Sequence, residues 1–252
     1  MIEIVLLLLA GCGSGMINAV AGGGNLLVFP AFLALGLSPF NAAVTGSLVV
    51  TPASYASAFG YRKDLRELPR KYFWLLLPGL FGAAVGMYLL HNTSHSLFEK
   101  LVPWLVLFAV ILFVFQPQLH KFLHRPAKLR FGSPLFLVAL GLMFACIYGG
   151  YFGAGVGFLI LVLCGFARFD TIYQMTGFKS LLTATMALMT VVSFGVSGEL
   201  AWKYGLIAAV GSVIGGYLGA RWSHRISPYV VRMVIAFIGT GVVIMTFARA
   251  YL

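Results

Sequence analysis

The sequence predicts an all-α polytopic membrane protein, built as an inverted-topology repeat of two halves. Three observations predict this class: the composition, the recurrence of apolar segments, and an ordered series of matches between the halves. Of the 252 residues, 61% are hydrophobic and only 9% are charged, whereas a soluble domain carries roughly 25% charged residues. Because so few polar residues cannot cover a wetted surface, we expect the chain to lie in a membrane.

Apolar segments recur along the whole chain, separated by short breaks. A helix needs about 20 residues to cross about 30 Å of hydrocarbon. The segments of sufficient length are 2–21, 40–60, 72–90, 97–115, 134–152, 171–196, 204–220 and 229–248. Two shorter segments, 26–36 and 157–167, could each cross about half of the core. We therefore predict eight long transmembrane helices plus two short half-helices, each of which either spans with its neighbour or turns back.

The net charge of +11 comes mainly from loops. Cytoplasmic loops are rich in Lys and Arg, which places the basic loops 61–71 and 116–131 inside. The loops 91–100 and 197–203 are poor in positive charge and are expected outside. This alternation puts the N-terminus outside. Since no basic folded face or tail is present, we expect no nucleic-acid partner.

The two halves match each other in order. The stretch "GGGN" (22–25) corresponds to "GAGV" (153–156). Further pairs, at a nearly constant offset of 131 to 133 residues, are Thr45 with Thr176, Gly46 with Gly177, Gly82 with Gly215, and Gly86 with Gly219. Equivalent loops fall on opposite sides of the membrane, so the repeat is inverted.

Three regions follow from this match: a first repeat over 1–115, a basic cytoplasmic linker over 116–132, and a second repeat over 133–252. Together they form one transport domain. Inverted repeats with broken helices are an architecture of secondary transporters, whose site lies near the midplane between the halves.

The glycine clusters are the first candidates for a site. "AGGGN" and "YFGAGVG" each interrupt an apolar run and lead into a short half-helix. Free N–H groups at the start of such a helix form an anion site at the positive end of its dipole. The alternative is that the glycines only allow close helix packing, and this is our interpretation of Gly82, Gly86, Gly215 and Gly219.

Lys179 is the second candidate, because it lies inside the apolar stretch "TGFKSLLTATMALM". A cation at this depth is costly and therefore predicts a functional role. No carboxylate lies in a spanning core to pair with it, which suits an anionic ligand. In the alternative interpretation the helix starts late and Lys179 extends to the interface.

Hydroxyl and amide side chains surround these two features. They are Asn18, Asn25, Thr45, Ser47, Thr51, Gln174, Thr176, Ser180 and Thr183. Taken one by one, such residues more often bond within or between helices, but as a set they are typical of a polar lining. The five histidines and three cysteines show no metal-ligand spacing, so we expect no metal and no cofactor. No motif indicates an enzyme.

The opening "GSGMINAVAGGGNLLVFPAFLALGLSPFNAAVTGS" and its weaker copy "YGGYFGAGVGFLILVLCGFARFDTIYQMTGFKS" resemble the TauE/SafE sulfite exporter family. The resemblance implies a multi-pass transporter of the cytoplasmic (inner) membrane for small sulfur-containing anions such as sulfite, sulfoacetate or other organosulfonates. Lys179 departs from the family pattern. With the residue-based candidates, the predicted substrate-binding residues are Asn18, Gly22, Gly23, Gly24, Asn25, Thr45, Ser47, Gly153, Gly155, Gly157, Gln174, Thr176, Lys179 and Ser180.

Alternating access of the two repeats around a midplane site is the expected mechanism. The expected partners are a small anionic substrate, membrane lipid and a coupled H⁺ or other ion, with uniport as the alternative. Two other functions stay open: an anion channel-like pore, and a non-transporting membrane assembly factor or enzyme. The sequence assigns no oligomeric state.

Overall fold

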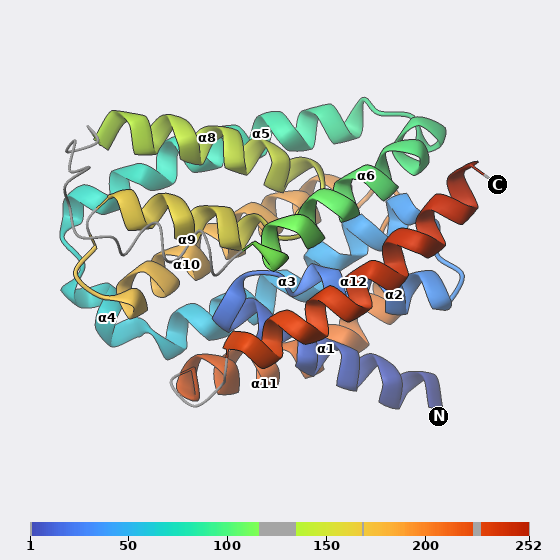
Figure 1. The fold of residues 1–252 in the computed structure, drawn as a ribbon, viewed down its shortest axis with the longest axis horizontal. Helices are drawn as coiled ribbons and strands as arrows, with labels where there is room; N and C mark the ends of the chain where they lie inside the picture. Colours follow the sequence, from blue (N-terminus) through green and yellow to red (C-terminus); the bar gives the residue numbers. More distant parts are fainter. Residues whose placement is uncertain (1, 116–134, 168, 224–227, 252) are drawn as a thin grey trace.

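The computed structural model describes residues 2–115, 135–167, 169–223 and 228–251, which form helices and short connections with no strand among them (Figure 1). The first half contains α1 (Ile2–Ala21), α2 (Asn25–Ala34), α3 (Pro39–Gly60), α4 (Arg62–Glu67), the 3₁₀ turn η1 (Arg70–Leu75), α5 (Leu76–His91) and α6 (His95–Val114). The second half contains α8 (Leu135–Tyr151), α9 (Val156–Phe166), α10 (Ile172–Phe194), α11 (Trp202–Arg221) and α12 (Pro228–Tyr251). The predicted linker 116–132 lies outside the described residues.

The all-helical, multi-pass prediction is confirmed in its coarse form. Among the described residues, five stretches are long and apolar enough to span a membrane: Ile2–Ala21, Arg70–His91, His95–Val114, Ile172–Phe194 and Met233–Tyr251. Helices α3 and α11 are of similar length but carry more small and polar residues, and α8 has 17 residues. The number of long transmembrane helices, eight, therefore stays a prediction.

Both short helices turn back beside the helix that precedes them. In Figure 1, α2 returns toward the end of the bundle that holds the N-terminus, while α9 returns toward the opposite end, where α4 lies. We call these the Glu199 end and the α4 end; the first is marked by an ion pair of 3.2 Å between His95 Nε2 and Glu199 Oε1.

Glycines in the left-handed region make both reversals. Gly22 has φ 77°, and its N–H donates to the carbonyl oxygens of Ile17 at 3.2 Å and Asn18 at 3.1 Å, which ends α1. Gly153 and Gly155, with φ 81° and 80°, follow α8. L-residues with a Cβ rarely adopt this conformation, so the turns depend on glycine.

Helices from different halves pack directly on one another. Helix α1 runs parallel to α11, and α5 runs parallel to α8, while α3 contacts α10 and α6 contacts α12. A Cβ on Gly82 would overlap the backbone of Met143, and one on Gly215 would overlap that of Cys12. The interpretation of Gly82, Gly86, Gly215 and Gly219 as close-packing residues is confirmed, because small residues let helix backbones approach in a membrane.

Two side chains explain where the longest central helices begin. The Ser38 hydroxyl accepts the N–H of Asn41 at 3.2 Å and caps α3, and the Thr171 hydroxyl accepts the N–H of Gln174 at 3.1 Å and caps α10. Ser and Thr are favoured at this position because they satisfy a backbone donor that has no partner in the helix. These caps fix α3 and α10, which carry the polar residues described next.

Candidate functional site

The two glycine breaks meet inside the bundle. A Cβ built on Gly22 would lie 2.6 Å from the Cα of Gly157, so the backbones are in direct contact. The ring of Phe113, from α6, covers this junction and would overlap a Cβ on Gly23. Breaks that are far apart in the sequence therefore form one junction between the halves.

A small cavity of about 30 Å³ lies beside this junction. Its polar and glycine lining consists of Asn25 from α2, Ser47 from α3, Gly149 from α8, Gly153 from the second break, and Thr183 and Thr190 from α10. Both halves thus contribute to its wall. A volume of this size holds about one or two waters.

Asn25 joins the two halves at this cavity. Its side chain is 4% exposed, and Nδ2 donates to the carbonyl oxygen of Phe152 at 3.4 Å. The Oδ1 atom lies against Gly46 of α3 and has no hydrogen-bond partner among the described residues. A buried polar atom without a partner is costly, and such an atom in a cavity wall is suited to a water or a ligand hydroxyl.

Lys179 is completely buried, and its ammonium group points to the end of α1. Nζ donates to the carbonyl oxygens of Asn18 at 2.6 Å and Ala19 at 3.2 Å. The Asn18 carbonyl also accepts the N–H of Gly22, so Lys179 is its second donor. The last carbonyls of a helix carry the negative end of its dipole, so a cation is stabilised there. The alternative in which Lys179 extends to the interface does not describe this structure.

No other charged residue is buried in the part of the chain that the structure describes. Lys179 does not line the small cavity, but Thr183 does, and the Thr183 hydroxyl donates to the Lys179 carbonyl oxygen at 2.7 Å. The lysine and the cavity are therefore one helical turn apart on α10.

Serines from three helices surround the Lys179 contact. Asn18 Nδ2 donates to Ser54 Oγ at 2.7 Å, and the Ser57 and Ser180 hydroxyls lie 3.1 Å apart. The Ser14 hydroxyl donates to the carbonyl oxygen of Gly24 at 2.8 Å. These bonds tie α1, α3 and α10 together at the first break, as buried polar groups require partners.

Three predicted residues have partners away from the cavity instead. The Thr45 hydroxyl accepts the N–H of Ala201 at 3.0 Å, the Thr176 hydroxyl donates to the Ile172 carbonyl at 2.7 Å, and Gln174 Oε1 accepts the N–H of Asp170 at 3.2 Å. The other predicted residues lie at the junction, in the cavity wall or in the serine cluster: Asn18, Gly22, Gly23, Gly24, Asn25, Ser47, Gly153, Gly155, Gly157, Lys179 and Ser180.

Four further polar residues near these sites were not predicted: Ser14, Ser54, Ser57 and Thr190. A signal for two of them was present, because Ser47 and Ser54 on α3, like Thr183 and Thr190 on α10, are seven residues apart. Residues at this spacing share one helix face, so each pair predicts a polar stripe that faces into the bundle.

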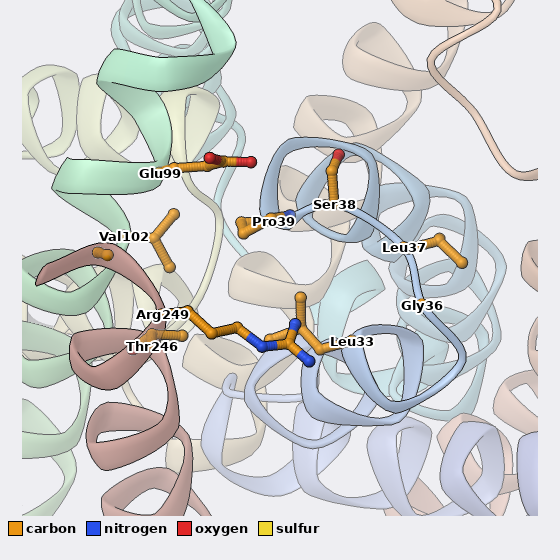
Figure 2. A pocket seen from close by; sticks show the side chains of 10 residues that line it. Leu33, Gly36, Leu37, Ser38, Pro39, Glu99, Val102, Thr246 and Arg249 are labelled. Atoms are coloured by element: carbon orange, nitrogen blue, oxygen red, sulfur yellow. The ribbon is translucent and has the colours of Figure 1, made fainter. Parts of the chain in front are cut away.

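A larger pocket of about 410 Å³ opens at the Glu199 end (Figure 2). The connection between α2 and α3 contributes Leu37 and Ser38, while Glu99 of α6 and Arg249 of α12 point into the same space. Both charged side chains are exposed. None of the predicted site residues lines this pocket.

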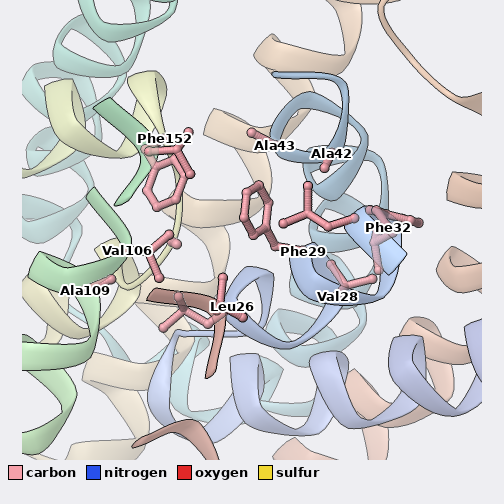
Figure 3. Packing of buried hydrophobic residues seen from close by; sticks show 14 of the residues in the cluster. Leu26, Val28, Phe29, Phe32, Ala42, Ala43, Val106, Ala109 and Phe152 are labelled. Carbon is pink, nitrogen blue, oxygen red and sulfur yellow. The ribbon is translucent and has the colours of Figure 1, made fainter. Parts of the chain in front are cut away.

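An apolar layer lies between this pocket and the small cavity. Phe29 of α2 and Phe152, next to the second break, pack edge to face with centroids 5.9 Å apart (Figure 3). Leu33 and Val102 belong to the same core cluster and also line the large pocket. The small cavity is therefore closed toward the Glu199 end by tightly packed apolar side chains.

Comparison with known proteins identifies the chain. Residues 7–246 match the family model described as "Sulfite exporter TauE/SafE". The chain belongs to this family. No solved structure matches the chain.

Relatives of this TauE/SafE protein carry transporter names. A "Probable membrane transporter protein" of Haemophilus influenzae is 29% identical over 220 residues, which is 86% of this chain and 84% of the relative. "Probable membrane transporter protein YfcA" of Escherichia coli K12 is 28% identical over 215 residues, which is 82% of this chain and 76% of the relative. "Probable membrane transporter protein ORF9" of Sinorhizobium sp. is 23% identical over 239 residues, which is 93% of this chain and 88% of the relative.

The family and these relatives confirm the predicted class: a multi-pass membrane transporter rather than an enzyme. They also confirm the resemblance drawn from the glycine-rich stretches.

Proposed function

We propose that this TauE/SafE protein is a secondary carrier of small sulfur-containing oxyanions, such as sulfite, sulfoacetate or other organosulfonates. The anion binds between the two glycine breaks, and the halves move against each other to change access. One observation carries the proposal: the only buried charge among the described residues, Lys179, lies beside the junction of the breaks.

The charge balance favours an anion. A buried cation without a carboxylate is expensive in a membrane, and an anionic ligand in its vicinity lowers that cost. The half-helices α2 and α9 begin at the breaks, so their free N–H groups add positive potential there. The amide of Asn25 and the hydroxyl of Ser47 would donate to the oxygens of the anion. The hydroxyls of Thr183 and Thr190 would first have to turn away from the Lys179 and Met186 carbonyls, to which they donate.

The packing supports an inverted repeat. Helix α1 packs on α11, and its equivalent α8 packs on α5, which is the equivalent of α11, so the two contacts are reciprocal. Helix α3 pairs with its equivalent α10, and α6 with α12. Gly22 and Gly153, which correspond in the sequence match, both have positive φ. Reciprocal contacts of this kind are expected of two halves related by a two-fold axis in the membrane plane.

The cavity holds about one or two waters, so binding a sulfur oxyanion requires its walls to part. We propose that the structure is a closed state in which the Phe29 and Phe152 layer blocks the Glu199 end. Arg62, Lys63 and Arg66 lie at the α4 end. Because Lys and Arg gather on the cytoplasmic side of a membrane, the α4 end would face the cytoplasm of the proposed inner-membrane protein.

Counterflow of sulfite in proteoliposomes tests this function. Liposomes loaded with unlabelled sulfite should take up [³⁵S]sulfite faster than liposomes without internal sulfite, because the loaded carrier returns more readily than the empty one. Internal sulfoacetate should stimulate uptake in the same way, whereas internal acetate should not.

Protein-free liposomes give the background. Uptake without stimulation by internal sulfite would instead support the channel-like pore. No flux and no binding of any of these anions would support the assembly factor or enzyme, and would contradict the proposal.

A further inference from the structure

Lys179 occupies the place of a coupling cation in a broken-helix transporter. Its Nζ is held by two backbone carbonyls, those of Asn18 and Ala19, in the last turn of the interrupted helix α1. In secondary transporters with broken helices, such carbonyls and helix C-terminal ends coordinate the coupled Na⁺ or H⁺. Here the cation is tethered to α10, so only its proton can leave.

The contact also crosses between the two halves. Lys179 belongs to α10 and its two acceptors belong to α1, so relative movement of the halves changes this contact. An ammonium group has three N–H donors and a neutral amine has two. The two carbonyls accept two of these N–H groups. The third N–H, which exists only when Lys179 is protonated, has no partner among the described residues and can be donated to an anion.

We infer that Lys179 is the proton-coupling residue of the carrier: it is charged when the anion is bound and neutral when the empty carrier resets. This inference rests on the proposed function. With the anion present, the ammonium and the anion balance each other as the halves move. Without the anion, an uncompensated charge opposes the movement, so Lys179 releases its proton to the side on which the anion leaves. One proton therefore crosses with each singly charged anion.

None of the carboxylates on the described elements that pack against α10 is buried beside Lys179. The elements that pack against α10 carry Glu3, Cys12, Tyr55, Arg62, Lys63, Asp64, Arg66, Glu67, Tyr88, His91, Cys146, Tyr148, Tyr151 and Cys164. The acidic members of this set are exposed or partly exposed.

Tyr61, just beyond α3, is close to the lysine contact, since it packs with Ala19 and lies against Gly177. Burial raises the pKa of Tyr61 to about 12, so this phenol stays neutral over the pH range of a transport assay.

The ratio of net uptake to exchange tests the inference. Exchange of internal for external [³⁵S]sulfite needs only the loaded carrier, whereas net uptake also needs the empty carrier to reset. Lys179→Arg keeps a cation that does not deprotonate. We expect this variant to lower the ratio of net uptake to exchange by about tenfold or more, while the matched control Lys203→Arg, at an exposed position of α11, leaves the ratio unchanged.

A wild-type measurement keeps the test decisive if Lys179→Arg fails to fold. Raising the lumen pH at constant external pH should accelerate the initial rate of net sulfite uptake by the wild type but not the rate of exchange. Equal ratios in Lys179→Arg and wild type, or net uptake insensitive to lumen pH, would overturn the inference and assign the proton to sulfite itself. Absence of sulfite exchange by the wild type would refute the proposed function instead.

Discussion

Gly22→Ala is expected to lower the free energy of unfolding by about 3 kcal/mol or more. Two penalties add at this position. Gly22 has φ 77°, which is strained for alanine, and the new methyl group would lie 2.6 Å from the backbone of Gly157. Thermal unfolding of the purified protein in detergent measures the effect.

Gly36→Ala separates the two penalties. Gly36 has φ 86°, but nothing lies within 4 Å of a Cβ there, so we expect only the backbone cost of about 1–3 kcal/mol. Gly157→Ala provides the complementary variant, because its methyl would meet Gly22 at 2.6 Å without a positive φ. If Gly22→Ala melts at the same temperature as Gly36→Ala, the two breaks are not in contact.

Asn25→Asp should weaken sulfite binding by about 10- to 100-fold, the loss expected for one hydrogen bond to a charged group. The substitution keeps the shape of the side chain but replaces the Nδ2 donor with an oxygen and adds a negative charge to the wall of the cavity. Sulfite affinity is measured by the ligand-dependent rise in melting temperature, since a ligand that binds the folded form stabilises it.

Asn92→Asp is the matched control, because Asn92 is exposed and its Nδ2 donates to the nearby Tyr88 carbonyl. It should bind sulfite like the wild type. Unchanged sulfite affinity in a folded Asn25→Asp variant would remove the cavity beside the breaks from the proposed binding site.

The glycine breaks could be predicted from the sequence because glycine is unfavourable in a helix interior. A cluster such as Gly22–Gly24 in an apolar run therefore signals an interruption, and the structure places it at the end of α1. Most helix bounds also follow from apolar length; the predicted segment 134–152 is α8, Leu135–Tyr151. The short helix α4 lies in what the sequence indicated as a basic loop, since its six residues are too few for a periodic signal.

The partners of the polar residues could not be predicted. Lys179 is 161 residues away from Asn18 in the sequence, and no local pattern states which carbonyls its side chain reaches. The sequence suggested an anion as the partner, but the structure shows the end of α1. Likewise Thr45 was predicted to line the site, yet its hydroxyl caps the N–H of Ala201, because tertiary packing decides which way a hydroxyl on a buried helix points.

Accessibility of a cysteine at position 47 to thiol reagents tests the central claim, that the cavity beside the breaks opens to each side in turn and holds the anion. Ser47→Cys is placed in a chain in which Cys12, Cys146 and Cys164 are replaced, and a membrane-impermeant reagent is applied to either face of oriented vesicles. Ser212→Cys, completely buried between α11 and α3, is the control and should not react. The account predicts that Ser47→Cys reacts from both faces and that sulfite slows both reactions. Reaction from one face only, or reaction that sulfite does not change, would contradict it.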